Sequence, residues 1–227
     1  EVVDRHLDGA LAAAVGTAGE LIGSVVHEVG WAKPYPEYAG EPDMDAMRAN
    51  YSYAPIIGSA EEAISGGAVA APYLSDEVFV GLVLQGPGCD YPSHVHKSEE
   101  IFWVTAGTSD WQMGDQWRVE GPGGVIHHES GVRHATVTRD EPLLMLFAWV
   151  TDPGCIPVIV RRCARCRNRC RGPGSRPVTA IRRTGPGCVA RGATDGSAPS
   201  ACTRPRWGST VPTVWPDRVV VRRVSSG

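Results

Sequence analysis

The chain has no long apolar run and little cysteine in its first part, and each shortage excludes a class of protein. None of its 227 residues lie in a stretch approaching the ~20 consecutive apolar residues of a membrane-spanning helix. The N-terminus also lacks a basic region ahead of a short apolar core, the mark of a secretory signal. Before residue 160, cysteine stands at Cys89 and Cys155 alone, too few for a disulfide framework. These shortages predict a cytoplasmic protein with no membrane partner.

Each part of the chain is also short of charge of one sign. Residues 1–160 hold 7 of the 22 Lys and Arg but 23 of the 25 Asp and Glu, and residues 161–227 reverse the balance. Such an asymmetry marks a boundary. Beyond Cys155 there is no Lys, His, Phe or Tyr, and the apolar residues follow no period. We therefore expect residues 153–227 to form a basic tail, rich in Arg, Gly, Pro and Cys, that builds no core.

Two further interpretations concern this tail. An abrupt change into Arg, Gly, Pro, Ala and Cys is what out-of-frame translation of a GC-rich gene produces, so we expect the tail to be either disordered or frameshifted. Cys163, Cys166 and Cys170 suggest the alternative of a zinc cluster, with the neighbouring arginines as a nucleic-acid patch. These three cysteines lack a spaced second ligand pair. We therefore expect no nucleic-acid partner.

Two regions precede the tail. In residues 1–72 the apolar spacing predicts a helical cover, with one or two helices from Asp4 to about Val29 and a short helix near residues 43–50. The face of the first helical stretch would carry Leu7, Leu11, Val15, Leu21 and Val25. Residues 73–152 change to short β-branched and apolar runs separated by Gly, Pro and Asp, at 78–84, 100–106, 110–113, 117–120, 124–127, 134–138 and 143–150. This pattern predicts a mainly β protein, a jelly-roll barrel behind an N-terminal helical cover.

Two histidines and a carboxylate within the barrel region have the spacing of a metal site. His94, His96 and Glu100 are separated by even numbers of residues, so on a strand their side chains point to the same face. Two imidazoles and a carboxylate suit Fe, Mn, Zn or Ni and leave positions open for substrate or water. We therefore predict one divalent transition metal at this site, with His134 on a later strand as the fourth ligand.

The two stretches that carry these residues resemble the two cupin motifs. The first motif, G(X)5HXH(X)3E(X)6G, is met at every position from Gly88 to Gly107. The second motif, G(X)5PXG(X)2H(X)3N, is met at its glycines and at His134, with Glu129 in place of its proline and Thr138 in place of its asparagine. The resemblance implies a cupin β-barrel.

Between Tyr91 and Trp149 the chain resembles one cupin family in particular. Its segments YPSHVH, EEIFWV, IHHESGVRHA and DEPLLMLFAW are similar to those of the cupin-type dimethylsulfoniopropionate (DMSP) lyases of marine bacteria. The resemblance implies a carbon–sulfur lyase in which a metal holds the substrate carboxylate. A tyrosine then removes the neighbouring proton, so that dimethyl sulfide leaves and acrylate remains. The metal would absorb the developing negative charge.

The sequence departs from this family where the base is expected. Two residues after the ligand glutamate these lyases usually have a tyrosine, and here Phe102 stands there, which cannot take a proton. Tyr91 matches a second tyrosine of the family's pocket and is our predicted catalytic residue, with metal-activated water as the alternative base. Tyr51, Tyr53 and Tyr73 are further phenols that the sequence does not place. We also predict that His128 contacts the substrate.

Three functions stay open at this point. The first is a metal-dependent DMSP lyase. The second is a cupin metalloenzyme of another reaction, such as an oxygenase or isomerase, for which Phe102 is no loss. The third is a small-molecule-binding cupin without catalysis. In each case the partner is a small molecule, and the pairing of barrel edges common among cupins favours a homodimer.

Overall fold

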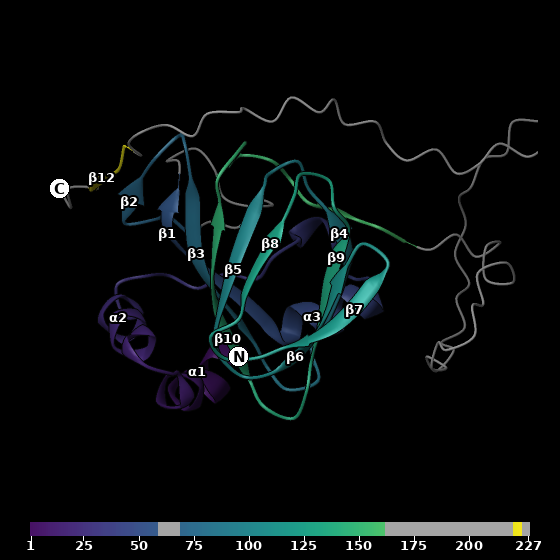
Figure 1. Cartoon of the computed structure of the whole chain (residues 1–227), viewed down its shortest axis with the longest axis horizontal. Helices are drawn as coiled ribbons and strands as arrows, with labels where there is room; N and C mark the ends of the chain where they lie inside the picture. The colour runs from purple at the N-terminus through teal and green to yellow at the C-terminus, as the bar shows by residue number, and fades with distance from the viewer. Residues whose placement is uncertain (59–68, 162–219, 224–227) are drawn as a thin grey trace, which may run out of the picture. The chain divides into compact units, whose positions relative to one another are not determined.

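The structure is a computed structural model that describes residues 1–58, 69–161 and 220–223. It is mainly β, with short helices ahead of the sheets (Figure 1). The helices are α1 (Val2–Ala13), α2 (Thr17–Val25), the 3-10 turn η1 (Pro36–Tyr38) and α3 (Pro42–Ala49). The strands are β1 (Tyr51–Gly58), β2 (Tyr73–Leu74), β3 (Phe79–Gln85), β4 (Asp90–Val95), β5 (Glu100–Ala106), β6 (Ser109–Met113), β7 (Gln116–Glu120), β8 (Val125–His128), β9 (His134–Thr138), β10 (Leu143–Trp149), β11 (Val158–Ile159) and β12 (Arg222–Arg223).

Two sheets enclose the main core. One has the order β12-β2-β1-β3-β10-β5-β8 and the other the order β11-β4-β9-β6-β7, and every pairing except that of β1 with β2 is antiparallel. Between them lie aromatic and large apolar side chains, including Phe79, Trp111, Ile126, Phe147 and Trp149. This arrangement confirms the predicted cupin jelly roll, and the predicted strands of the barrel region fall within a residue or two of the observed ones.

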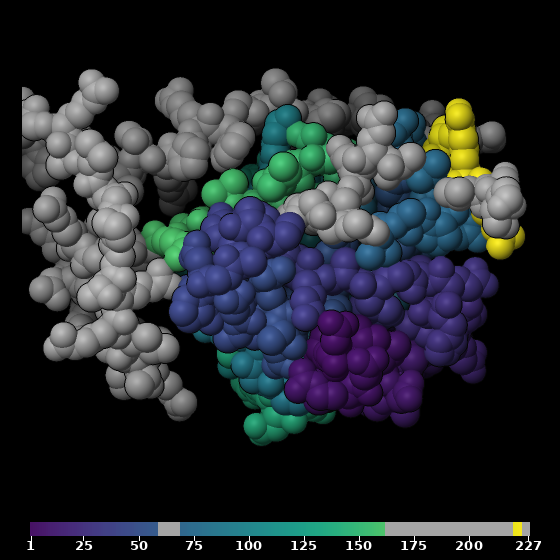
Figure 2. Space-filling model, turned by 180° about the vertical axis from the view of Figure 1, so that it is seen from behind, coloured from purple at the N-terminus to yellow at the C-terminus, as the bar shows by residue number. Residues whose placement is uncertain are grey.

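The helical cover packs on the outer face of the larger sheet. Helix α1 starts with a capping box between Glu1 and Asp4, and it lies against β3 and β10. A second apolar cluster forms there, built from Leu7, Ile22 and Val26 of the cover and from Leu82, Leu84 and Leu144 of the sheet. Figure 2 shows the cover from outside, with α1 in purple against the body of the protein.

The predicted apolar face of the cover is wrong in its second half. Val15 is 44% exposed and Leu21 is 62% exposed, whereas Ile22 and Val26 are buried. The reason is a break between the helices: Gly16 has a φ of 57°, so α2 starts with a new direction and a new helical phase. A single periodicity carried across Gly16 therefore selects the wrong residues.

The larger sheet begins earlier than the sequence predicts. Strand β1 lies within residues 1–72 and pairs with β3 from Tyr51↔Gln85 to Ile57↔Val80. Pro55 argues against a strand because it cannot donate a ladder hydrogen bond. The structure accommodates it at a register shift between Pro55 and Ile57. The cover therefore contributes a strand to the sheet as well as helices.

The packed chain also continues past residue 152. Residues Ile156–Val160 are mostly apolar, and within them β11 pairs with β4 so that Ile159 lies opposite His94. The three cysteines considered as an alternative zinc cluster, and with them most of the tail expected to be disordered or frameshifted, lie outside the described residues. Over the described residues, no helix combines the length and apolar character needed to cross a membrane.

Candidate metal centre

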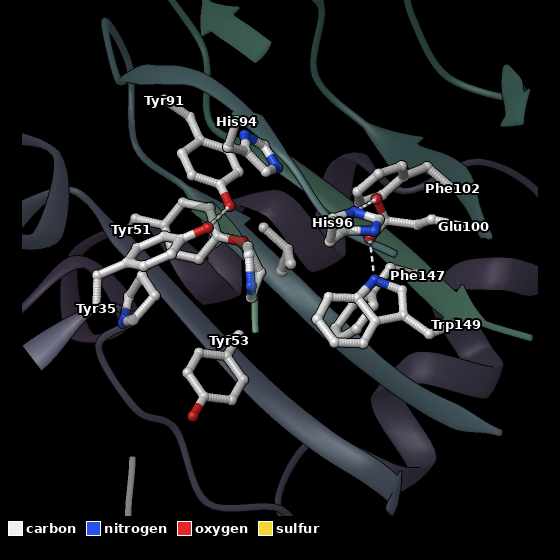
Figure 3. Close-up of a pocket in the computed structure, with 13 residues that line it drawn as sticks. Tyr35, Tyr51, Tyr53, Tyr91, His94, His96, Glu100, Phe102, Phe147 and Trp149 are labelled. Carbon is white, nitrogen blue, oxygen red and sulfur yellow. Dashed lines mark hydrogen bonds and ion pairs between the residues drawn. The ribbon is translucent and has the colours of Figure 1, made fainter. Parts of the chain in front are cut away.

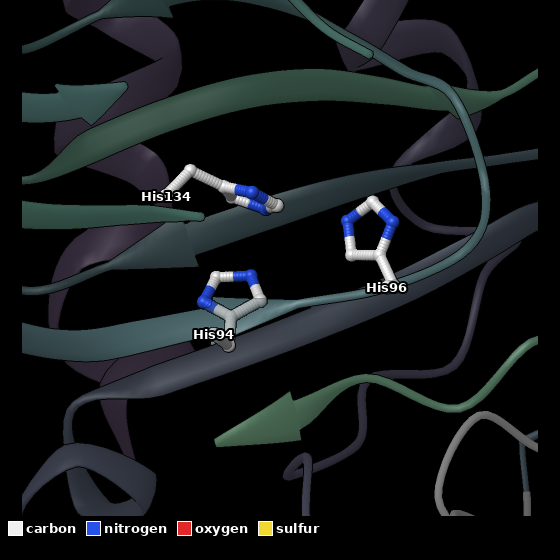
Figure 4. A group of neighbouring side chains, drawn as sticks. All are labelled: His94, His96 and His134. Carbon is white, nitrogen blue, oxygen red and sulfur yellow. The ribbon is translucent and has the colours of Figure 1, made fainter. Parts of the chain in front are cut away.

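Four side chains from three strands meet inside the barrel. Strand β4 and the residue after it carry His94 and His96, and β9 begins with His134 (Figure 4). Strand β5 begins with Glu100. The pairing of β4 with β9 sets His94 directly opposite His134. All four side chains are buried. The structure thus brings together the four residues that the sequence singled out as ligands.

Each histidine is held in one orientation by the backbone. The Nδ1 atoms of His94, His96 and His134 lie 3.0, 2.8 and 2.9 Å from the carbonyl oxygens of Pro92, Ser98 and Val132. A carbonyl can only accept, so in each neutral ring Nδ1 carries the proton and Nε2 carries the lone pair. The potential ligand atoms of the three rings lie within 4.8 Å of one another. This is the arrangement in which outer hydrogen bonds prepare histidines for a metal.

Glu100 completes the ring of ligand atoms. Its Oε1 accepts the indole N–H of Trp149 at 2.7 Å, and its Oε2 lies 2.9 Å from His96 Nε2 and 3.2 Å from His134 Nε2. Burial alone would raise the pKa of Glu100, but His96 and His134 together hold it well below its usual range. The carboxylate is therefore ionised at neutral pH and provides the negative charge of the site.

Among these ligands the histidine pKa values shift in opposite directions. Burial and the neighbouring His134 and His96 lower the pKa of His94 well below its usual value. Burial would lower the pKa of His96 too, but the Glu100 carboxylate raises it. His134 Nε2 is buried without a hydrogen-bond partner among the described residues, despite its proximity to Glu100. The unpaired nitrogen of His134 and the negative charge of Glu100, buried among imidazole rings, both call for a cation, so these residues fit a divalent metal.

The loop between the ligands is fixed by the segment that follows β10. Ser98 N–H donates to Cys155 Sγ at 3.2 Å, and Glu99 N–H donates to Thr151 Oγ1 at 2.8 Å. These bonds hold residues 97–99, which connect His96 to Glu100. The spacing HXH(X)3E therefore corresponds to a strand end and a short anchored loop rather than to one continuous strand.

His128 lies behind the ligands. Its ring stacks on His134 at 4.2 Å between centroids, and its Nε2 accepts the indole N–H of Trp111 at 2.9 Å. Burial lowers the pKa of His128 to about 3, so the ring is neutral. The cavity beside the ligands is lined by thirteen described residues, and His128 is outside that set. Contact of His128 with a substrate stays a prediction, while its observed contacts are with His134 and Trp111.

The cavity itself is walled by aromatic rings (Figure 3). Its lining consists of Pro34, Tyr35, Tyr51, Tyr53, Val83, Tyr91, His94, His96, Glu100, Phe102, Phe147, Trp149 and Pro157. Phe102 occupies the wall on β5, where its ring packs edge-on against Trp111 at 5.0 Å. Tyr91 lies beside the ligands, with its ring centroid 4.3 Å from that of His94. None of the described lining residues is Lys or Arg.

Tyr35 is among the cavity residues that the sequence did not single out. Tyr35 is buried, and its hydroxyl is hydrogen bonded to that of Tyr91. The sequence could have indicated Tyr35 by its position between Pro34 and Pro36, because a tyrosine between two prolines has little conformational freedom. Tyr51 and Tyr53, which the sequence named without a position, also line the cavity, whereas Tyr73 is outside the lining.

Proteins similar to this chain identify its family. The family model of dimethylsulfoniopropionate lyase matches residues 1–145, more than half of the chain. The chain belongs to the DMSP lyase family. The resemblance stated from its motifs is thereby confirmed.

A curated relative of this chain is a DMSP lyase. The chain is 38% identical over 89 residues to the dimethylsulfoniopropionate lyase DddQ of Ruegeria pomeroyi, an alignment that covers 39% of this chain and 44% of that relative. The chain thus spans less than half of that curated relative's length.

Solved structures extend the likeness further along the chain. The crystal structure of DddQ from Ruegeria pomeroyi DSS-3 has a TM-score of 0.53 and 28% identity, covering 65% of this chain and 71% of that one. A structure described as that of the DMSP lyases RdDddP and RnDddQII has a TM-score of 0.52 and 22% identity, with 68% and 76% coverage, and supports the fold alone.

Proposed function

We propose that this chain is a metal-dependent lyase that cleaves DMSP to dimethyl sulfide and acrylate. The observation that carries the proposal is the convergence of His94, His96, Glu100 and His134 beside an aromatic cavity that Tyr91 lines. Membership of the DMSP lyase family supports the same reaction.

The cavity matches the two charged ends of the substrate. DMSP has a sulfonium cation at one end and a carboxylate at the other. The rings of Tyr51, Phe147 and Trp149 give the sulfonium a cation–π surface, worth about 0.5–2 kcal/mol. No described lining residue is Lys or Arg, so we assign the metal as the counter-charge of the carboxylate. When bound, the divalent cation supplies the positive charge that stabilises the carboxylate and the negative charge developing beside it.

Tyr91 is the proposed base. After the phenol has lost its own proton to solvent, its phenolate oxygen accepts the proton from the carbon next to the carboxylate, and the released electron pair forms the carbon–carbon double bond. The carbon–sulfur bond breaks, dimethyl sulfide leaves with that bonding pair, and acrylate remains. Burial, with Tyr35 and Tyr51 nearby, raises the pKa of Tyr91 well above its usual value in the cation-free protein. The phenol is therefore protonated there, and it can act as a base only with a cation in the site.

Phe102 favours one other candidate. A phenylalanine in the wall next to Glu100 removes a hydroxyl from the place where these lyases usually have one, which suits a cupin metalloenzyme of another reaction. Headspace analysis separates the two: the 227-residue chain, loaded in turn with Fe(II), Mn(II), Zn(II) and Ni(II), should release dimethyl sulfide from DMSP with at least one metal. If the chain releases dimethyl sulfide with none of these metals, the proposal that it is a DMSP lyase is wrong.

Two variants then test the base. Tyr91→Phe should reduce the rate of release by about 100-fold or more, the size expected for loss of a general base. Tyr73→Phe is the matched control, because Tyr73 lies outside the cavity lining, and its rate should equal that of the parent chain. If Tyr91→Phe keeps the parent rate, another group removes the proton.

A further inference from the structure

The phenols of the cavity come from the side opposite Phe102. Four tyrosines line it: Tyr51 and Tyr53 from β1, Tyr91 from β4, and Tyr35 from the loop before η1. The hydroxyls of Tyr35 and Tyr91 are hydrogen bonded to each other (Figure 3). The segment ahead of the barrel therefore reaches into the site with a polar group that touches the proposed base.

Tyr35 is held there in an uncommon backbone conformation. Its φ of 57° and ψ of 55° lie in the left-handed region, which a bulky residue rarely adopts. Such a conformation costs about 1–3 kcal/mol and persists where the surroundings impose it, often at functional sites.

Contacts on both sides impose the conformation of Tyr35. Arg48 Nε donates to the Pro34 carbonyl at 2.9 Å, and on the other side Tyr38 N–H donates to the Tyr35 carbonyl at 3.1 Å. Earlier in the loop, Ala32 and Tyr53 exchange backbone hydrogen bonds at 2.9 and 3.0 Å. The loop is thus fastened to α3 and to β1, which keeps the phenol of Tyr35 inside the cavity.

From this geometry we propose that Tyr35 is a positioning residue for Tyr91, so that the N-terminal cover is part of the reaction site. The inference rests on the proposed function, in which Tyr91 takes the proton. As the base, Tyr91 is a phenolate, so the hydroxyl of Tyr35 donates to its oxygen. This bond occupies one side of the Tyr91 oxygen, holds the oxygen in place and leaves its other lone pairs for the substrate proton. The ring contact with His94 fixes the other end of the same phenol.

A purely structural reading of the pair predicts a different outcome. Two buried hydroxyls satisfy each other, so removal of one leaves the other unpaired and costs about 1–3 kcal/mol of stability, whereas removal of both is nearly neutral. That reading changes the free energy of unfolding but leaves the turnover of the folded enzyme unaffected. Kinetics and stability therefore have to be measured on the same variants.

The first experiment compares kcat and KM for dimethyl sulfide release at a temperature well below each variant's unfolding midpoint. Tyr35→Phe should lower kcat about tenfold or more, with KM within about twofold, because misplacement of a reacting group affects the chemical step. Tyr38→Phe, on the same loop and outside the cavity lining, should match the parent chain. The Tyr35→Phe/Tyr91→Phe double variant should be no slower than Tyr91→Phe alone, because residues acting as a unit are not additive. An unchanged kcat in Tyr35→Phe, or the same further loss in the Tyr91→Phe background, overturns the proposal.

A second measurement stands independently of turnover. In protein labelled with 13C at the tyrosine Cζ, the hydroxyl proton shared by Tyr35 and Tyr91 should be visible by NMR as a slowly exchanging resonance. It should disappear in Tyr35→Phe and persist in Tyr38→Phe. A parent chain that shows this proton but releases no dimethyl sulfide contradicts the proposed function and leaves the contact intact. A parent chain without the proton overturns the positioning role itself.

Discussion

Replacing Glu100 by Gln should separate metal binding from folding. An amide has nearly the shape of the carboxylate, so its oxygen can keep the indole bond of Trp149 while its NH2 donates to the Nε2 atoms of His96 and His134. The change removes a buried charge and leaves no donor unpaired. At a pH above the raised pKa of His96, where this ring is neutral, we therefore expect the cation-free variant to unfold at a temperature equal to or above that of the parent chain.

The effect of the metal sets the expected magnitude. A cation present at a hundred times its Kd stabilises the folded state by about 2.7 kcal/mol. For a chain of this size that raises the unfolding midpoint by about 5–11 °C. If loss of the charged oxygen of Glu100 weakens binding about 100-fold, the same concentration gives about 0.4 kcal/mol and a rise of about 1–2 °C.

Differential scanning calorimetry with and without Mn(II) measures both quantities. Glu99→Gln is the control, since Glu99 Oε1 is paired with His127 Nε2 at 3.0 Å and that pair is outside the ligand set. Its metal-induced rise should equal that of the parent chain. A Glu100→Gln chain that still rises as far as the parent refutes the ligand role of Glu100, and a lower cation-free midpoint refutes the account of the buried charge.

The same assay has a defined pH dependence. Burial opposes but does not cancel the effect of Glu100, which raises the pKa of His96 above its ordinary value. In the cation-free protein, the stability due to this proton is present below the ordinary imidazole pKa and is lost as pH rises through the raised one. The metal must displace that proton. The metal-induced rise in midpoint should therefore grow from about pH 6 to about pH 8, and a rise that shrinks over this interval contradicts the ligand assignment of His96.

Two further predictions concern stability and use urea unfolding. Gly107→Ala should lower the free energy of unfolding by about 3 kcal/mol or more, because Gly107 has a φ of 82° and an added Cβ would collide with the Pro142 carbonyl. Gly114→Ala, at a φ of 60° with nothing within 4 Å of the added Cβ, should lower it by about 1 kcal/mol. Equal losses in the two variants would contradict the role of the collision. Trp111→Phe should lower the free energy of unfolding by about 2 kcal/mol, because it leaves His128 Nε2 buried without its donor. The number of metal ions bound per chain should stay unchanged. A lower number would mean that His128 affects the metal-binding residues more directly than its stacking on His134 implies.

The strands and the convergence of the four ligand residues were predictable from the sequence for a local reason. Turn glycines mark the strand ends, and the spacing HXH(X)3E between Gly88 and Gly107 predicted that His94, His96 and Glu100 meet in the barrel interior. The premise of one continuous strand was wrong, because His96 follows the end of β4 and Glu100 begins β5. The pairing of β4 with β9 then had one suitable partner, His134, in a stretch that itself reads as a strand.

Features that depend on distant segments were not predictable in this way. The helical phase of α2 is reset by the backbone of Gly16, and β1 includes a proline that becomes acceptable only at a register shift against β3. Tyr35 enters the cavity because Arg48 fixes its loop, a contact that leaves no periodic trace. Substrate contact by His128 stays a prediction, and its observed partner Trp111 lies on a different sheet and is recognised only in three dimensions.

The short pairing of β11 with β4 has a consequence for solubility. Without β11, the strand carrying His94 would be the border of the smaller sheet, with its backbone N–H and C=O groups open to another chain. Val158 and Ile159 occupy that border, and Val160 N–H donates to the Ser93 carbonyl at 2.7 Å. The six residues from Cys155 to Val160 thereby block the addition of a strand from another molecule next to β4, which carries His94.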